Sequence, residues 1–309
     1  MFEKVAQESE VAEMPSVELK SVVEMLAQSV PDFSDDIHEL RIRFADLASR
    51  NKIDAGITIS HRTVGGVGVI ETSHAPDLHT TILFFHGGAY VAGSATESLS
   101  LSSEIGVVAG AKVVSVDYRL APEHPYPAGV QDSLNVYAQL IEDGTNPESI
   151  VVAGASAGGG LAITLLIAAK AQGLPMPGAC VVFSPWIDLE LTGESLRTRA
   201  DVDPSLTVNG LRRAATDYLH GRSPRHSGAN ALHASLAGLP PMFIQVGSRE
   251  ILFDDSIRLA AHAGTAGVSV ELQCWPEMVH VFQAFAAQLP EGRAALQAAG
   301  AFIRTKVTP

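Results

Sequence analysis

Short apolar runs rich in Val, Ile and Phe alternate along this chain with longer segments whose apolar residues recur at helical spacing. This alternation is typical of an α/β fold, in which a mostly parallel sheet carries helices on both faces. The predicted strands are residues 57–60, 67–71, 80–85, 112–116, 149–154, 179–184, 242–247 and 270–275. Because these strands suit one sheet, we expect the 309 residues to form one domain, 1–309.

Helical patterns lie between the predicted strands. Ser94 and Glu97 have the spacing of a capping box, in which each side chain satisfies a backbone N–H of the other, and they mark the first helix start. The predicted helices begin near Ala95, Ala128, Ala157, Ile251, Val281 and Arg293.

Two segments depart from the alternation of strand and helix. Within the first fifty residues, apolar side chains at helical spacing predict two amphipathic helices, around 19–26 and 37–47. A further helix, which carries Leu211 and Tyr218, interrupts the strands. We expect the segments of about 1–50 and about 190–235 to form a helical cap over one end of the sheet.

Composition and charge exclude several classes of function. A formal net charge of −13 without clustered Lys and Arg argues against a nucleic-acid partner, because phosphate binding needs concentrated positive charge. The uncharged stretch 151–169 contains glycines in its middle, which argues against a membrane span. The first ten residues lack the basic and apolar regions of a secretory signal, so we expect a cytoplasmic location.

The strand predicted at 149–154 runs into Gly-Ala-Ser-Ala-Gly and then into a helix. A serine at such a sharp turn has a strained backbone, and the residues two positions away must be small so that strand and helix can approach. The helix N-terminus behind the serine offers free N–H groups, including that of Ala157, to an oxyanion. Ser156 is therefore the predicted nucleophile; the alternative is a glycine-rich turn whose serine only caps the helix.

A second glycine cluster, His-Gly-Gly, follows the strand predicted at 80–85. Gly87 and Gly88 can present their backbone N–H groups at close range, because no side chain intervenes. Serine hydrolases with this order of elements form the other half of the oxyanion hole at this turn. We interpret His86 as structural, since it precedes both the turn and the serine.

A serine nucleophile needs a base within hydrogen-bond reach and a third group that orients the base. In serine hydrolases built on such a sheet, the order along the chain is serine, acid, histidine. Of the eleven histidines, only His262 and His280 follow Ser156 and the candidate acids. His262 falls within a helical pattern, whereas His280 lies in a loop after the last predicted strand. His280 is therefore the predicted base.

Three carboxylates follow the next-to-last predicted strand. Glu250 lies in the turn directly after the strand, where it can face His280. Asp254 and Asp255 fall about one turn into the next helix, and Asp254 is spaced to pair with Arg258 on the helix surface. Glu250 is the predicted acid, and Asp254 is the alternative.

Six stretches occur in an order that resembles one known family. They are HGGAY at 86–90, DYRLAPEHPYPAG at 117–129, GASAGG at 154–159, SPWIDL at 184–189, LPPMFIQVGSRE at 239–250 and MVHVF at 278–282. Over about residues 80–285 the chain resembles the bacterial hormone-sensitive-lipase-like esterases of the α/β-hydrolase fold, in the branch with a GxSAG turn and a glutamate as acid.

The resemblance implies a serine carboxylesterase that acts on small, short-chain esters without a metal or an organic cofactor. Ser156 would be its nucleophile, His280 its base, and the N–H groups of Gly87, Gly88 and Ala157 its oxyanion hole. Relatives are often dimers, so the resemblance also implies a homodimer.

Two departures from the family pattern concern the site. Ala89 stands where many members have a third glycine, which leaves both N–H donors of the turn intact. Many members also have aspartate followed by Pro-Leu at the acid position, whereas this chain has Glu250 followed by Ile-Leu.

The sequence also bears on other functions. An amidase, a lactonase or a deacetylase could use the same three residues, and no motif in the sequence excludes them. A non-catalytic ligand receptor of this fold would keep the pocket and lose the base, yet His280 is present. A zinc hydrolase would have to use His220, His226 and His233, which lack an HExxH motif.

Overall fold

The structure, a computed structural model, describes residues 16–50 and 53–307. Its sheet has eight strands in the order β1-β2-β4-β3-β5-β6-β7-β8. Strand β2 is antiparallel to both of its neighbours, and all other neighbouring pairs are parallel. The strands are β1 (Thr58–Val64), β2 (Val67–Ser73), β3 (Thr80–Phe85), β4 (Ala111–Val116), β5 (Ile150–Ala155), β6 (Ala179–Phe183), β7 (Met242–Gly247) and β8 (Val270–Trp275). The predicted α/β class and its mostly parallel sheet are confirmed.

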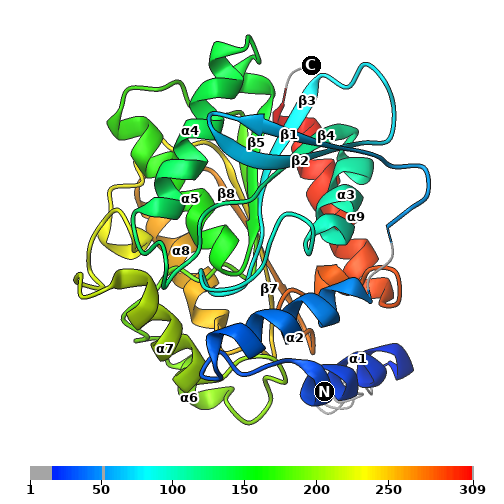
Figure 1. Cartoon of the computed structure of the whole chain (residues 1–309), viewed down its shortest axis with the longest axis vertical. Coiled ribbons are helices and arrows are strands. Elements are labelled where there is room, and N and C mark those ends of the chain that lie inside the picture. The colour runs from blue at the N-terminus through cyan, green and yellow to red at the C-terminus, as the bar shows by residue number, and fades with distance from the viewer. Residues whose placement is uncertain (1–15, 51–52, 308–309) are drawn as a thin grey trace, which may run out of the picture.

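Helices cover both faces of the sheet. Figure 1 shows α4, α5 and α8 on one face and α3 and α9 on the other. Because both faces are covered, every residue of β5, β6 and β7 is buried, whereas six of the seven residues of the edge strand β1 are exposed. The α-helices of the described chain are α1 (Val17–Ser29), α2 (Ile37–Ser49), α3 (Leu99–Ala109), α4 (Ala128–Glu142), α5 (Ala157–Ala171), α6 (Ser195–Thr198), α7 (Val208–Leu219), α8 (Phe253–Thr265) and α9 (Pro290–Lys306).

Two helix starts differ from the prediction. The Ser94 hydroxyl accepts a hydrogen bond from the Glu97 N–H at 3.2 Å, yet residues 95–98 form turns and α3 begins only at Leu99. The Ala95 N–H is bonded instead to Asp117 Oδ1 at 2.6 Å, which holds this turn against the end of β4. After Val281 the chain forms only a short 3₁₀ helix, η3 (Phe282–Phe285).

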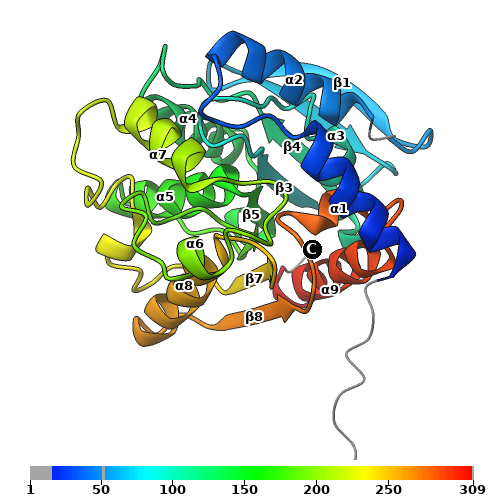
Figure 2. The ribbon, with the colours of Figure 1, turned by 90° about the horizontal axis from the view of Figure 1, so that it is seen from below.

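The helices outside the alternation lie at one end of the molecule. Helices α1, α2, α6 and α7 are at the bottom of Figure 1, and Figure 2 shows them around the ends of the central strands. Buried residues of α1 share an apolar cluster with residues that follow β8, among them Leu19 with Val279 and Phe282. The expected cap segment 1–50 is described from residue 16 onward, since residues 1–15 lie outside the described residues.

Candidate active site

The turn between β5 and α5 has the strained geometry that its sequence predicts. Ser156 has φ 55° and ψ −123°, a conformation that few residues other than glycine adopt. A Cβ atom on Gly154 would collide with the carbonyl oxygen of Gly158, and one on Gly158 with the carbonyl oxygen of Phe85. The two glycines therefore allow strand and helix to approach on either side of the serine.

Ser156 and His280 line the same cavity, which has a volume of about 280 Å³. Residues of the loop after β3 and of the turn after β5 line it, and α1, α2 and the segment between them supply many of its apolar lining residues. The apolar wall residues from this N-terminal part are Met25, Leu26, Val30, Phe33, Phe44, Leu47 and Ala48. The cavity therefore joins residues that lie far apart in the sequence.

Backbone N–H groups are available beside the serine. Gly87 and Gly88 line the cavity, and a Cβ atom on Gly87 would lie 3.3 Å from Cβ of Ser156. Ala157 is the first residue of α5 and is not among the residues that line the cavity. Within residues 16–50 and 53–307, no protein acceptor takes a hydrogen bond from these three N–H groups. The N–H groups of Gly87 and Gly88 are thus available within the cavity, whereas Ala157 is outside its lining.

His86 also lines the cavity, but its ring is held by the surrounding loop. The ring stacks on Tyr118 with 4.1 Å between centroids, and Nδ1 lies 2.7 Å from the Gly87 carbonyl oxygen. Burial lowers the pKa of His86 to about 4. This environment agrees with the structural interpretation of His86.

The structure brings His280 against Glu250. His280 Nδ1 lies 2.6 Å from Glu250 Oε2, and the glutamate side chain is fully buried. The other carboxylate oxygen, Oε1, accepts hydrogen bonds from the Ser184 hydroxyl and the Gly247 N–H, both at 2.7 Å. Both oxygens of the carboxylate are thus held in place. Because Glu250 engages Nδ1 of the imidazole, Nε2 remains available to a substrate or to Ser156.

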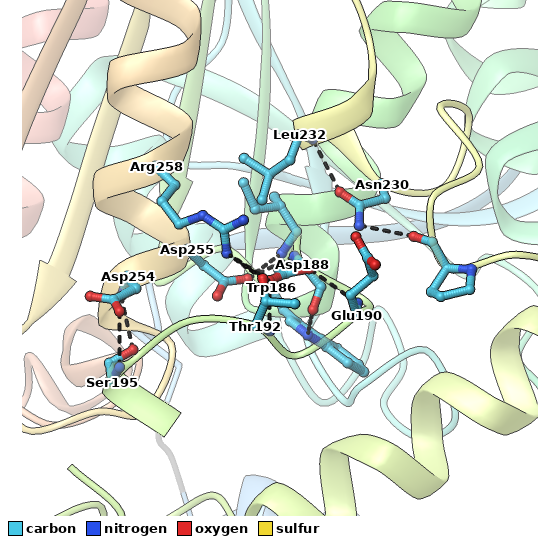
Figure 3. A network of polar contacts seen from close by, with 12 residues as sticks. Trp186, Asp188, Glu190, Thr192, Ser195, Asn230, Leu232, Asp254, Asp255 and Arg258 are labelled. Carbon is cyan, nitrogen blue, oxygen red and sulfur yellow. Dashed lines mark hydrogen bonds and ion pairs between the residues drawn. The ribbon is translucent and has the colours of Figure 1, made fainter. Parts of the chain in front are cut away.

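The alternative acid, Asp254, is directed elsewhere. Its Oδ2 accepts a hydrogen bond from the Ser195 N–H at 2.9 Å, as Figure 3 shows. The prediction that Asp254 pairs with Arg258 on the helix surface is wrong, because Arg258 Nη1 forms an ion pair with Asp188 Oδ2 at 2.6 Å. The third carboxylate, Asp255, accepts hydrogen bonds from the backbone N–H groups of residues 187 and 188. Only Glu250 of the three candidates contacts His280 within the described residues.

Opposing effects determine the protonation of His280. Burial lowers its pKa, but the charge and hydrogen bond of Glu250, together with the charges of Asp203 and Asp255, raise it. The balance places the pKa of His280 above its ordinary value of 6.5. The site thus favours the imidazolium that a general base becomes when it takes a proton.

Two polar residues near His280 and Glu250 were not predicted from the sequence. Ser184 donates to Glu250 Oε1 and accepts from the Val281 N–H at 3.1 Å, so it links the acid to the chain beside His280. The signal was its place directly after β6, since the carboxyl ends of parallel strands meet at one edge of a sheet. Asp203 gave no comparable signal, because it precedes α7 in a segment without strands.

The remaining histidines do not gather into a site. His226 Nδ1 lies 3.3 Å from the Tyr126 hydroxyl, His233 pairs with Glu190 at 2.8 Å, and His262 Nε2 lies 2.8 Å from the Ala234 carbonyl oxygen. The described residues hold no group of three or more His, Cys, Asp or Glu that could bind a metal ion. None of their helices has the length and apolar character that a membrane crossing requires.

Known proteins resemble this chain over most of its length. The sequence model of the α/β-hydrolase fold family matches residues 82–284. An acetyl-hydrolase of Streptomyces hygroscopicus is 46% identical over 225 residues, which are 73% of this chain and 75% of that protein. An esterase of Acinetobacter venetianus is 38% identical over 70% of this chain and 71% of its own.

Solved structures extend the similarity to three dimensions. A crystal structure of an esterase from the bacterial hormone-sensitive lipase family has a TM-score of 0.91 and 38% identity. The alignment covers 95% of this chain and 99% of that one. The chain therefore belongs to the α/β-hydrolase fold family and, within it, to the bacterial hormone-sensitive-lipase family of esterases.

Proposed function

We propose that the protein is a serine carboxylesterase that hydrolyses small carboxylic esters through an acyl-serine intermediate. One observation carries the proposal: the buried Glu250 carboxylate lies 2.6 Å from His280, and His280 shares a cavity with Ser156 on its strained turn. The esterases and the acetyl-hydrolase among the relatives support the same reaction class.

In the proposed first step, His280 takes the proton of the Ser156 hydroxyl as its oxygen attacks the ester carbonyl carbon. Glu250 accepts a hydrogen bond from Nδ1–H, so the lone pair of the imidazole is on Nε2, and the carboxylate then stabilises the imidazolium. The N–H groups of Gly87, Gly88 and residue 157 would receive the developing negative charge on the carbonyl oxygen.

The tetrahedral intermediate then collapses. The C–O bond to the alcohol breaks, His280 returns its proton to the leaving alkoxide, and the acyl group stays on Ser156. A water molecule attacks the acyl-enzyme with His280 again as the base, and the carboxylic acid leaves. No group outside the chain enters these steps, apart from the ester and water.

The cavity supports a preference for short acyl chains. Its volume of about 280 Å³ is at the lower limit of ordinary ligand pockets, and side chains of α1 and α2 bound it. The 46% identical relative is named an acetyl-hydrolase, which also favours a small acyl group. An amidase, a lactonase or a deacetylase would use the same residues; the first expels an amine, the second opens a cyclic ester, and the third removes an acetyl group.

The proposal also includes a helical cap, a homodimer and a cytoplasmic location. Segments 16–50 and 190–235 would form the cap; the first supplies much of the cavity wall, and the second supplies Ser205 and Leu206. A homodimer and a cytoplasmic location remain predictions, which analytical ultracentrifugation of the purified protein and cell fractionation test.

The proposal is tested with p-nitrophenyl acetate, butyrate and decanoate. We expect turnover of the two short esters, slower turnover of decanoate, and a loss of about 10⁶-fold in kcat for Ser156→Ala. The matched control is Ser60→Ala, which removes the hydroxyl of an exposed serine on β1. Full activity of Ser156→Ala would overturn the nucleophile, and decanoate turned over as fast as acetate would overturn the size preference.

A further inference from the structure

The carboxylate of Asp203 connects two parts of the site. Its Oδ2 accepts a hydrogen bond at 2.8 Å from the N–H of Ile251, the residue after Glu250. Its Oδ1 accepts hydrogen bonds from the N–H groups of Ser205, at 2.8 Å, and Leu206, at 3.0 Å. Ser205 and Leu206 line the cavity. One side chain therefore holds both the turn of the acid and a piece of the cavity wall.

The charge of Asp203 is not neutralised by a Lys or Arg ion pair within the described residues. Arg199 is close in sequence, but its guanidinium donates to the Ser248 carbonyl oxygen and lies 4.0 Å from the ring centroid of Phe253. Burial raises the pKa of Asp203, and the charge of His280 lowers it. The side chain whose positive charge acts on Asp203 is thus His280.

We propose that Asp203 is a positioning residue of the hydrolytic reaction. Its carboxylate fixes the Glu250 turn relative to the cavity wall, and its negative charge stabilises the imidazolium that His280 becomes during attack by Ser156. This inference rests on the proposed esterase function. Asp203 acts through other groups, since Glu250 makes the direct contact with the imidazole.

Loss of the Asp203 charge and displacement of its carboxylate should affect activity in different ways. The carboxylates that act on His280 are Glu250 in direct contact, Asp203 from the segment before α7, and Asp255 from α8. Removing the Asp203 charge makes the imidazolium less favourable, so the acid limb of the pH profile moves to lower pH. Moving the carboxylate without removing its charge disturbs the geometry but leaves that limb in place.

The experiment compares Asp203→Asn with Asp201→Asn, an equal change of charge at an exposed position two residues away. The readout is kcat/KM for p-nitrophenyl butyrate between pH 5 and 9. For Asp203→Asn we expect a midpoint at lower pH and about a 10-fold loss of kcat/KM at pH 8. Asp201→Asn should match the wild-type profile. A loss at all pH values with an unmoved midpoint would overturn the proposal.

Asp203→Glu supplies the second variant. It keeps the charge and displaces the hydrogen-bonding oxygens, so we expect the wild-type midpoint with a lower kcat. If circular dichroism shows Asp203→Asn unfolded, a shifted midpoint in Asp203→Glu would overturn the proposal. A wild-type protein without esterase activity refutes the proposed function, whereas an active wild type with an unchanged Asp203→Asn profile refutes only this inference.

Discussion

In the proposed mechanism, the protonation state of the single residue His280 sets the pH range of activity. Burial lowers the pKa of His280, but the surrounding carboxylates, Glu250 first, raise it above 6.5. Only the neutral imidazole accepts the proton of Ser156. The rising limb of kcat/KM should therefore lie above pH 6.5, and activity should be lost as the pH falls below it.

Removing the charge of each candidate acid in turn tests which carboxylate acts on His280. Glu250→Gln removes the carboxylate that contacts His280, so we expect a fall in kcat of about 10⁴-fold and a rising limb at lower pH. Asp254→Asn makes the same chemical change at a carboxylate bonded to Ser195, and its rate and limb should be those of wild type. Both are read from pH–rate profiles with p-nitrophenyl butyrate. The reverse ranking of the two variants would assign the acid to Asp254.

Figure 3 shows a second pair of carboxylates, Asp188 in the loop that follows β6 and Asp255 in α8. Burial raises the pKa of Asp255 to about 7. For Asp188, hydrogen bonds from Thr192 and Arg258 outweigh burial, which acts in the opposite direction, and lower the pKa. The pKa values of the two neighbouring carboxyl groups are thus shifted in opposite directions, upward at Asp255 and downward at Asp188.

This raised pKa predicts a pH-dependent stability. A carboxyl group whose pKa is higher in the folded than in the unfolded protein stabilises the fold fully below about pH 4, and this stabilisation is lost as the pH rises to about 7. Asp255→Asn keeps an oxygen that can accept the two backbone hydrogen bonds and cannot ionise. Urea unfolding should therefore show wild type losing stability relative to Asp255→Asn between pH 5 and 8. An equal difference at both pH values contradicts this prediction.

At the scale of elements, α2 places one apolar face on the cavity and the other in solvent. Phe44 lines the cavity beside Phe33, with 6.1 Å between ring centroids, whereas Ile42 on the same helix is 70% exposed. Of these two side chains, only Phe44 should affect the length of ester that the site accepts.

Phe44→Ala should shift the preference toward longer acyl chains. Space for two more methylene groups is worth about 1.6 kcal/mol, so the ratio of kcat/KM for octanoate to that for acetate should rise by about 10-fold. Ile42→Ala shortens an apolar side chain on the exposed side and should leave the ratio unchanged. If both variants give the wild-type ratio of p-nitrophenyl ester hydrolysis, α2 does not limit the acyl chain.

The strands could be predicted from sequence because burial on both faces leaves continuous apolar runs, as in β5 and β6. Helix starts were less predictable where a distant group intervenes. The start of α3 follows the bond from Ala95 to Asp117, 22 residues apart in the chain, and a local capping pattern does not contain that contact. Likewise, the segment after β8 has an apolar pattern, but it packs against α1 as a 3₁₀ helix.

At the scale of the whole molecule, parallel topology explains why distant motifs could be assigned to one site. The turns after β3, β5 and β7 lie at the same edge of the sheet, so the sequence alone predicts that Gly87, Ser156 and Glu250 lie close together. Asp203 and the part of the cavity wall formed by α1 and α2 could not be assigned to the site in this way, because no strand order fixes where those segments pack. Their positions depend on tertiary contacts such as the pairing of Asp203 with the Ile251 N–H.

The folded chain should make one serine hydroxyl nucleophilic, and reaction with a p-nitrophenyl alkylphosphonate identifies that serine. The serine oxygen would bond to phosphorus as p-nitrophenolate leaves, so mass mapping locates the adduct. We predict one adduct, on Ser156, with esterase activity lost in proportion to labelling and with slow labelling of His280→Ala. An adduct on a different residue, or full activity in protein labelled at Ser156, would contradict the claim.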